Sequence, residues 1–143
     1  MENALALRGL STVNIYADDV AAAGKWYSEL LGIAPYFANP NAEQPAYLEY
    51  RLGDYQHELG IIKSAFRPKA DAAGAGGAIV YWHVDDLNAS LEVLKSKGAK
   101  EHAPITTHGD GFVTASVVDP FGNILGVMFN QHYLDTLASK SNH

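Results

Sequence analysis

"STVNIYADDVAAAGKWYSELLG", residues 11–32, joins a strand pattern to a helix pattern within one short run of sequence. Every second residue from Val13 to Ala17 is apolar, as in a β-strand that is buried on one face only. The Asp-Asp pair at 18–19 offers a carboxylate that can cap the first turn of a helix. The helix pattern then runs to Gly32, a residue type that commonly ends helices. The stretch therefore predicts a strand followed directly by an amphipathic helix.

The same pattern occurs again in "AIVYWHVDDLNASLEVLKSKGA", residues 78–99, where a second Asp-Asp pair separates a strand pattern from a helix pattern. Asp18 corresponds to Asp85 at an offset of 85 − 18 = 67 residues. A Leu-Gly-aliphatic run also occurs twice, and its glycines, Gly60 and Gly126, are 126 − 60 = 66 residues apart. Two separate matches at nearly one spacing indicate an internal duplication.

Each repeat continues into three further strands, so the chain is predicted to be an α+β protein made of two tandem βαβββ modules. These strands are expected near residues 35–39, 47–53 and 57–64, and then near 101–108, 112–118 and 124–130. The run "DPFG" (119–122) is a turn signal before the last of them. We expect a single domain over residues 1–143. Its parts are module one at about 10–66, a small-residue linker at about 67–77, and module two at about 78–131. The C-terminal tail at 132–143 is expected to be a short helix or a frayed end.

Composition limits the function classes. The chain has 143 residues, of which 48% are hydrophobic, enough for one domain with a packed core. A net charge of −6 argues against a protein that grips nucleic acid or an anionic membrane. No apolar run is long enough to span a bilayer, and the first residues, 1–4, lack the pattern of a secretion signal. With no cysteine, disulfides and thiolate metal sites are excluded. We therefore expect a cytoplasmic protein.

The duplicated module, with Asp-Asp after its first strand, "WYSELLG" in its helix and "DPFGN" before its last strand, resembles the vicinal oxygen chelate superfamily. That family includes glyoxalase I, the extradiol dioxygenases, and the bleomycin- and fosfomycin-resistance proteins. The resemblance extends from about Leu10 to Gln131. It implies that the two modules form a cupped mixed β-sheet with the helices on its outer face. Such folds host several chemistries, so the resemblance specifies the fold far more closely than the activity.

In metal-dependent members of this family, the ion is held by inward residues on the first and last strand of each module. The resemblance places those positions at Thr12, Gly60, Ile79 and Gly126. Glycine and isoleucine have no donor atom in their side chains, and a threonine hydroxyl is a weak ligand for a divalent ion. We therefore expect no metal and no other cofactor in the cup.

The two glycines have two interpretations at this stage. They leave volume in the cup for a ligand, or they allow close packing of strands or a local bulge.

Strand alternation then assigns the other residues that face the cup. The predicted ligand pocket consists of Thr12, Asn14, Tyr16, Tyr47, Glu49, Arg51, Gly60, Ile62, Ile79, Tyr81, His83, Gly126 and Met128. An aromatic and apolar lining with a few polar groups is typical of a small-molecule site.

Several polar residues have a functional and a structural interpretation. His83 is either a general base or a hydrogen-bonded structural residue, and Glu58 is either an acid/base carboxylate or a solvated residue at the rim. Arg51 either forms an ion pair with Glu49 or across strands, or binds an anionic ligand. A shifted metal site built from His83, Glu58 and Glu49 is the less favoured possibility. Four other histidines lack paired ligand spacing and are expected at strand ends or in loops on the surface: His57, His102, His108 and His132.

These observations lead to three functional hypotheses. The leading one is a metal-free protein that binds a small aromatic or amphipathic molecule in the cup, as the drug-sequestering resistance proteins do. The alternative is a lyase or isomerase that uses His83, Glu58 or a shifted metal. The third is an interaction protein with a vestigial pocket. A homodimer is expected, with no nucleic-acid or membrane partner.

Overall fold

The computed structural model describes residues 5, 8, 10–66 and 78–141, and the chain divides into two compact units, Met1–Asp71 and Ala72–His143. The predicted linker at 67–77 and the first four residues lie outside the described part. Each unit has the strand-helix-three-strand order that the sequence predicts. The single domain and the cup shared by both modules stay predictions, and each unit is described by itself.

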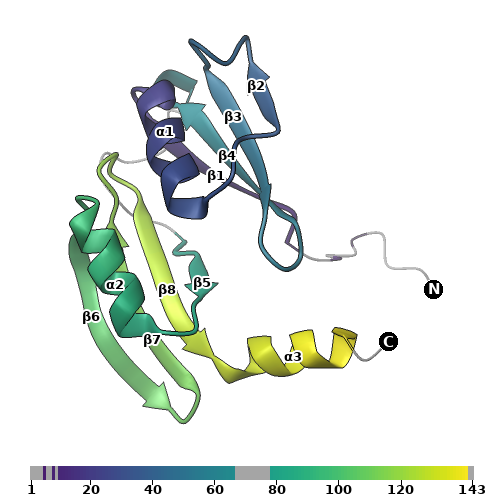
Figure 1. The fold of residues 1–143 in the computed structure, drawn as a ribbon, viewed down its shortest axis with the longest axis vertical. Helices are drawn as coiled ribbons and strands as arrows, with labels where there is room; N and C mark the ends of the chain where they lie inside the picture. The colour runs from purple at the N-terminus through teal and green to yellow at the C-terminus, as the bar shows by residue number, and fades with distance from the viewer. Residues whose placement is uncertain (1–4, 6–7, 9, 67–77, 142–143) are drawn as a thin grey trace. The chain divides into compact units, whose positions relative to one another are not determined.

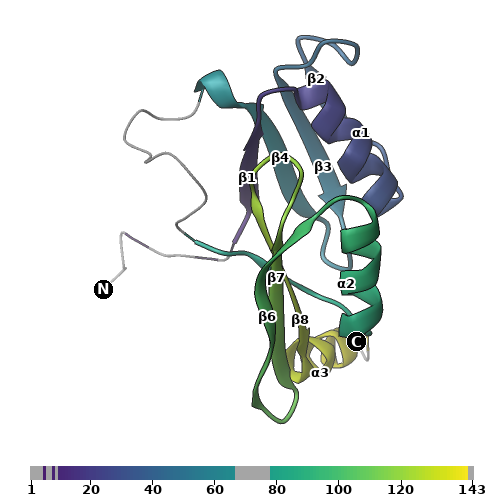
Figure 2. The same cartoon turned by 90° about the vertical axis from the view of Figure 1, so that its left-hand side faces the viewer.

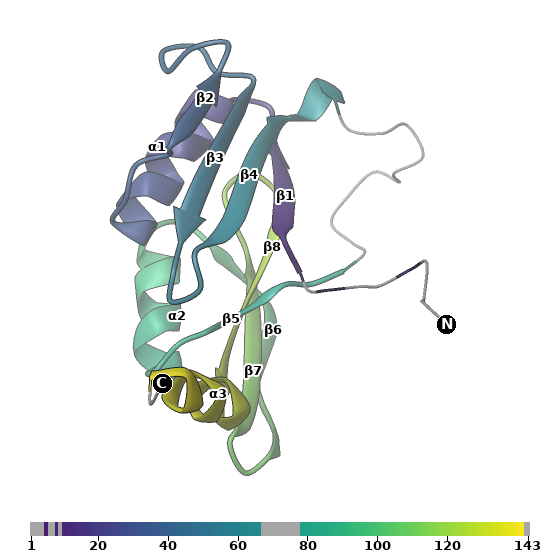
Figure 3. The same cartoon turned by 90° about the vertical axis from the view of Figure 1, so that its right-hand side faces the viewer.

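The first unit contains β1 (Thr12–Ala17), α1 (Val20–Leu31), β2 (Phe37–Asn39), β3 (Tyr47–Leu52), β4 (His57–Lys63) and a short 3₁₀ turn, η1 (Ser64–Phe66). Its strands are ordered β1-β4-β3-β2, with β1 parallel to β4 and the other pairs antiparallel. Figure 3 shows these four strands side by side. The α1 helix covers one face of this sheet (Figure 2), and no α-helix among the described residues of this unit lies on the opposite face, which we call its helix-free face.

Local chemistry explains the limits of α1. The Asp19 carboxylate accepts a hydrogen bond from the backbone N–H of Ala22 at 3.0 Å, which caps the first turn. Gly32 ends the helix with a left-handed φ of 71°, and its N–H bonds to the carbonyl of Ser28. Of the two aspartates that the sequence left open, Asp19 is therefore the cap.

The second unit contains β5 (Tyr81–His83), α2 (Leu87–Ser96), β6 (Lys100–Gly109), β7 (Phe112–Val118), β8 (Ile124–Asn130) and α3 (Gln131–Ser141). Its strand order is β5-β8-β7-β6, the same topology as in the first unit. The tail forms the helix α3, which continues from the end of β8 (Figure 1). Asp86 caps α2 through a 3.0 Å bond from the N–H of Ala89, as Asp19 does in α1. No helix within the described ranges has the length and apolar character to cross a membrane.

The "DPFGN" run forms the turn between β7 and β8. Asp119 is buried, and its Oδ1 accepts bonds from the backbone N–H groups of Phe121 at 2.9 Å and Asn123 at 2.8 Å. Gly122 has φ 91°, a conformation that glycine adopts without strain. The motif therefore holds a tight turn.

Each core lies between a sheet and its helix. In the first unit the side chains of Leu48, Tyr50, Leu59 and Ile61 are buried, and the Tyr50 hydroxyl donates to the carbonyl of Gly24 in α1 at 3.0 Å. In the second unit the core includes Leu87, Leu91, Leu94, Ala115, Val117, Leu125 and Val127. Because side chains alternate between the faces of a strand, these buried sets fix which residues lie on the opposite face of each sheet.

Candidate functional site

The helix-free face of the first sheet holds most of the residues that the sequence assigns to a ligand pocket. In register, Thr12 lies beside Glu58, and Gly60 lies between Asn14 and Glu49. The predicted pocket residues on this face are Thr12, Asn14, Tyr16, Tyr47, Glu49, Arg51, Gly60 and Ile62, together with Glu58.

A connected group of aromatic and charged side chains lies on this face, and we call it the aromatic–polar cluster. It consists of Tyr36, Phe37, Tyr47, Glu49, Arg51 and Glu58. Its centre is the carboxylate of Glu49, which accepts hydrogen bonds from the hydroxyls of both Tyr36 and Tyr47. The Tyr36 hydroxyl also lies 3.2 Å from Glu58 Oε2, so one phenol links the two carboxylates.

Three rings give the cluster its apolar surface. Phe37 pairs with Glu49 in the β2–β3 register, and its ring lies 6.0 Å from the ring of Tyr47 in an edge-on arrangement. The Tyr36 ring lies 6.5 Å from that of Phe37. Tyr36 and Phe37 are each 46% exposed, which is high for large aromatic residues. The cluster therefore presents ring surface and hydrogen-bonded charges together.

Arg51 forms the cross-strand ion pair that was one of its two predicted roles. Its Nε donates to Glu58 Oε2 at 3.1 Å, while its guanidinium lies 4.2 Å from the centre of the Tyr36 ring. Thr12 Oγ1 also donates to Glu58, at 3.1 Å. The bonds from Arg51 and then Thr12 hold the pKa of Glu58 below its ordinary value. Glu58 is thus held ionised, which suits an acceptor better than a general acid.

The tyrosines of the cluster are held in their protonated form. The hydrogen bond to Glu49 is the main cause that raises the pKa of Tyr36 to about 12. Burial, followed by the bond to Glu49, raises the pKa of Tyr47 still further. Both phenols therefore donate hydrogen bonds near neutral pH, and neither is suited to act as a base there.

The structure overturns the idea that the two glycines leave volume for a ligand. A Cβ atom on Gly60 would collide with Asn14 Oδ1 and would lie 3.1 Å from the Tyr47 ring. A Cβ atom on Gly126 would lie 2.6 Å from the Tyr81 ring and 2.8 Å from the backbone oxygen of Val80. The space above each glycine is filled by the protein's own atoms. Gly126 therefore allows close packing against backbone, which was the other interpretation, whereas the atoms above Gly60 belong to side chains.

The remaining predicted pocket residues lie on the face of the second sheet opposite α2 or, for Ile79, just before β5. Tyr81 pairs with Gly126, and His83 pairs with Met128, between β5 and β8. Met128 is buried, Tyr81 is 40% exposed, and Ile79 is partly exposed just before β5. Because β5 begins at Tyr81, the strand is shorter than the pattern at 78–84 predicts.

His83 has the contacts of a structural residue. Its Nδ1 accepts the backbone N–H of Asn130 at 3.1 Å, so the neutral ring carries its proton on Nε2, which lies 3.1 Å from Asp85 Oδ1. The ring stacks on Tyr133 of α3 at 4.8 Å, and the side chain is only 7% exposed. Both nitrogens are engaged, so the geometry favours the structural over the general-base interpretation.

Two other histidines make contacts that the sequence interpretation missed. Both are exposed, as expected of surface residues; His108 lies at the end of β6 and His102 lies within it, and each bonds a hydroxyl of β7. His102 Nδ1 lies 2.9 Å from Ser116 Oγ, and His108 Nε2 lies 2.9 Å from Thr114 Oγ1. Alternation along "EHAPITTH" (101–108) could not reveal these pairs, because β6 has register shifts against β7. Tyr36 and Phe37 were also missed, since a strand near 35–39 was expected but its facing was not assigned.

At the positions that the resemblance implies for metal ligands, the side chains offer a single donor atom. These positions hold Thr12, Gly60, Ile79 and Gly126, and Thr12 already donates its hydroxyl to Glu58. Within the described ranges, no group of three or more His, Cys, Asp or Glu residues is arranged to hold a metal ion. The side chains of the first sheet are instead arranged for hydrogen bonding and ring contact.

Comparisons with known proteins agree with this fold. The chain matches the model of the Glyoxalase/Bleomycin resistance protein/Dioxygenase superfamily over residues 9–127. No curated protein sequence matches it significantly. A glyoxalase-related enzyme from Fulvimarina pelagi has a TM-score of 0.66 at 21% identity, over 87% of this chain and 90% of its own. A bleomycin resistance determinant encoded on transposon Tn5 has a TM-score of 0.59 at 21% identity, over 86% of this chain and 98% of its own. Lactoylglutathione lyase from Agrobacterium tumefaciens has a TM-score of 0.64 at 16% identity, over 88% of this chain and 96% of its own.

Proposed function

This chain belongs to the Glyoxalase/Bleomycin resistance protein/Dioxygenase superfamily, and we propose that it is a metal-free member that binds a small aromatic or amphipathic molecule without breaking a bond. The ligand would lie against the helix-free face of the first sheet. The observation that carries the proposal is the aromatic–polar cluster, in which exposed rings surround hydrogen-bonded charges.

The cluster supports binding because its rings are available while its polar groups are already ordered. Exposed aromatic surface next to fixed hydrogen-bond partners is a common feature of small-molecule sites. The bonds among Tyr36, Tyr47 and Glu49 hold the rings in place before any ligand arrives. A prepared site loses less conformational entropy on binding than a mobile one. Since the space above Gly60 is filled, the ligand would stack on the rings rather than enter a cavity at the glycine.

The metal-free part of the proposal rests on residue chemistry. The four positions implied for metal ligands offer one hydroxyl and no imidazole or carboxylate. The candidate acid/base residues also have other partners: His83 is engaged at both nitrogens, and Glu58 is paired with Arg51. These contacts favour binding over lyase or isomerase chemistry.

A thermal-shift screen of small aromatic and amphipathic molecules tests the proposal. A ligand that binds only the folded state raises the melting temperature, and its affinity can then be measured by calorimetry. In Phe37→Ala the affinity should fall by about tenfold, since one stacking ring contributes on the order of 1 kcal/mol or more. Phe66→Ala is the matched control, because Phe66 is an exposed ring of the same unit outside the cluster.

Three outcomes would contradict the proposal. Equal loss of affinity in Phe37→Ala and Phe66→Ala would place the ligand elsewhere. A stoichiometric transition metal retained through dialysis, in protein purified without chelators, would refute the metal-free state. Conversion of the bound compound to a product, followed by chromatography, would replace binding with catalysis.

We also propose that the protein is a homodimer in solution. Among the described residues, each four-stranded sheet has two edge strands, and such edges favour association. Light scattering at several concentrations gives the mass directly, and a monomer at every concentration would refute the dimer.

A further inference from the structure

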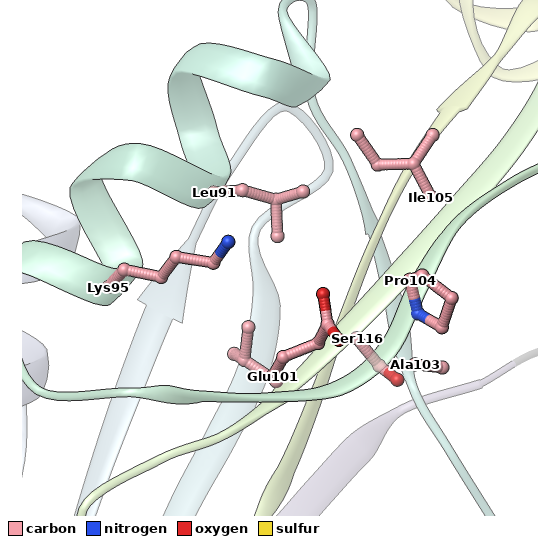
Figure 4. Close-up of a pocket in the computed structure, with 8 residues that line it drawn as sticks. Leu91, Lys95, Glu101, Ala103, Pro104, Ile105 and Ser116 are labelled. Carbon is pink, nitrogen blue, oxygen red and sulfur yellow. The ribbon is translucent and has the colours of Figure 1, made fainter.

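A separate hollow lies on the helix-covered side of the second sheet, between α2 and the strands β6 and β7. It has a volume of about 290 Å³. Figure 4 shows the side chains around it, from the helix on one side and the strands on the other. None of the residues that the sequence assigned to a ligand site lines this hollow, which we call the α2–β6 pocket.

The pocket lies beside a stretch of β6 that does not follow β7 in regular register. Their pairing shifts between Glu101 and Ala103 and again between Ala103 and Thr106. Such irregularities bend a strand and redirect its side chains, and they are common beside binding sites. Pro104 lies inside this irregular stretch, where it removes a backbone donor.

The floor and one wall of the pocket are apolar. Leu91 of α2 and Val117 of β7 are both buried, and Ala103 adds a small side chain. Ile105 at the border is 44% exposed, which leaves an aliphatic surface open to solvent. A ligand with a short aliphatic group would cover this surface and gain free energy from its burial.

Two opposite charges face the pocket from different elements. Lys95 comes from the last turn of α2, and Glu101 comes from β6. Neither forms an ion pair within the described part of the chain. Figure 4 shows Lys95 extending from the helix toward the hollow, near Leu91. The pocket thus combines an ammonium, a carboxylate and an aliphatic floor.

We propose that the α2–β6 pocket binds a small zwitterion with an aliphatic side chain, namely a free aliphatic α-amino acid. Its carboxylate would pair with Lys95, its ammonium with Glu101, and its side chain would lie on Leu91 and Val117. A volume of about 290 Å³ suits a molecule of this size. Only a ligand with both charges matches both walls, because a simple carboxylate would be repelled by Glu101 and a simple amine by Lys95.

Lys95 has a structural role to separate from binding, since a cation in the last turn stabilises a helix. Lys95→Met would then lower the melting temperature slightly without affecting a ligand. The proposal requires that Lys95→Met also lowers the affinity for the ligand. It requires the same loss of affinity in Glu101→Gln, where no helix end is involved.

The test is a titration of ¹⁵N-labelled full-length protein with L-leucine, followed by amide chemical shifts. We expect saturable shifts in α2, β6 and β7, and weaker binding of 4-methylpentanoate and 3-methylbutylamine, which each carry one of the two charges. Lys95→Met and Glu101→Gln should each weaken leucine binding by about tenfold, in the range for a charge-assisted hydrogen bond. Glu92→Gln, an exposed change on α2 outside the pocket, should leave the affinity unchanged.

The absence of saturable shifts with leucine would overturn the proposal, as would shifts confined to the aromatic–polar cluster. If either single-charge analogue binds as tightly as leucine, the pocket does not require both charges, and the proposed preference for a zwitterion is refuted. The analogues are tested on the unmodified protein, so this result does not depend on whether the variants fold. The pocket lies outside the aromatic–polar cluster, and Phe37→Ala should not change leucine binding.

Discussion

Replacing Gly126 by alanine should destabilise the protein, because the added methyl group has no room. Its Cβ would lie 2.8 Å from the backbone oxygen of Val80, which accepts the 3.0 Å hydrogen bond from the Gly126 N–H. The same atom would lie 2.6 Å from the Tyr81 ring. A ring can rotate, but the Val80 oxygen moves only if β5 moves away from β8. Alanine should therefore weaken the pairing of these strands.

The size of the effect follows from two opposing terms. Overpacking at a close contact costs about 1–3 kcal/mol. Alanine also lowers the entropy of the unfolded chain, which returns about 0.4–1 kcal/mol. Gly126 does not have a left-handed backbone, so no conformational strain adds to these terms. The net loss is roughly 1–2 kcal/mol, equivalent to a fall in melting temperature of roughly 3–8 °C for a chain of this size.

Gly60→Ala is the matched control on the first unit. Its closest contact is the terminal oxygen of Asn14, an exposed side chain that can rotate away. Tyr47 at 3.1 Å needs to shift by only a few tenths of an ångström. The entropy gain should offset most of this cost, which leaves the free energy of unfolding within about 1 kcal/mol of the parent.

Calorimetry and amide hydrogen exchange together test this reasoning. Exchange should accelerate in β5 and β8 of Gly126→Ala and stay near parent values in β1 and β4 of Gly60→Ala. An unchanged melting temperature for Gly126→Ala, or an even lower one for Gly60→Ala, would refute the close-packing account. An unchanged melting temperature for Gly126→Leu would restore the hypothesis that this glycine keeps volume open.

Three further predictions concern single contacts. Tyr50→Phe should lower the free energy of unfolding by about 1–2 kcal/mol in urea titrations, because the Gly24 carbonyl loses its buried donor. Asp119→Ala should cost about 2–3 kcal/mol, since two backbone N–H groups of the turn lose their acceptor; a loss below about 1 kcal/mol would contradict this. Arg51→Met should raise the pKa of Glu58 toward its ordinary value in an NMR titration. The pKa of Glu58 is lower in the folded state than in the unfolded state. Its contribution to stability is therefore present above the unfolded pKa and is lost as the pH falls through the folded pKa. Arg51→Met should lose less stability over this fall in pH.

The sequence by itself determined the fold, because the relevant information is local and occurs twice. Alternating apolar residues, the aspartate caps and the "DPFG" turn each act through neighbouring residues, and the structure confirms the order of elements in both units. Alternation also separated the helix-covered from the helix-free face of the first sheet, since side chains must alternate along a regular strand. The short β5 and the irregular β6 were beyond this reasoning, because both depend on how neighbouring strands pair.

Only the tertiary structure decided what the candidate residues do. The sequence shows a glycine, but whether the space above it is empty depends on side chains from other strands, here Asn14, Tyr47 and Tyr81. It shows His83, but not that a backbone N–H 47 residues away engages one ring nitrogen. The partner of Arg51 and the hollow beside α2 likewise depend on contacts between distant segments. Local patterns report the preferences of the backbone, whereas packing and hydrogen bonding are set by residues that only the folded chain brings together.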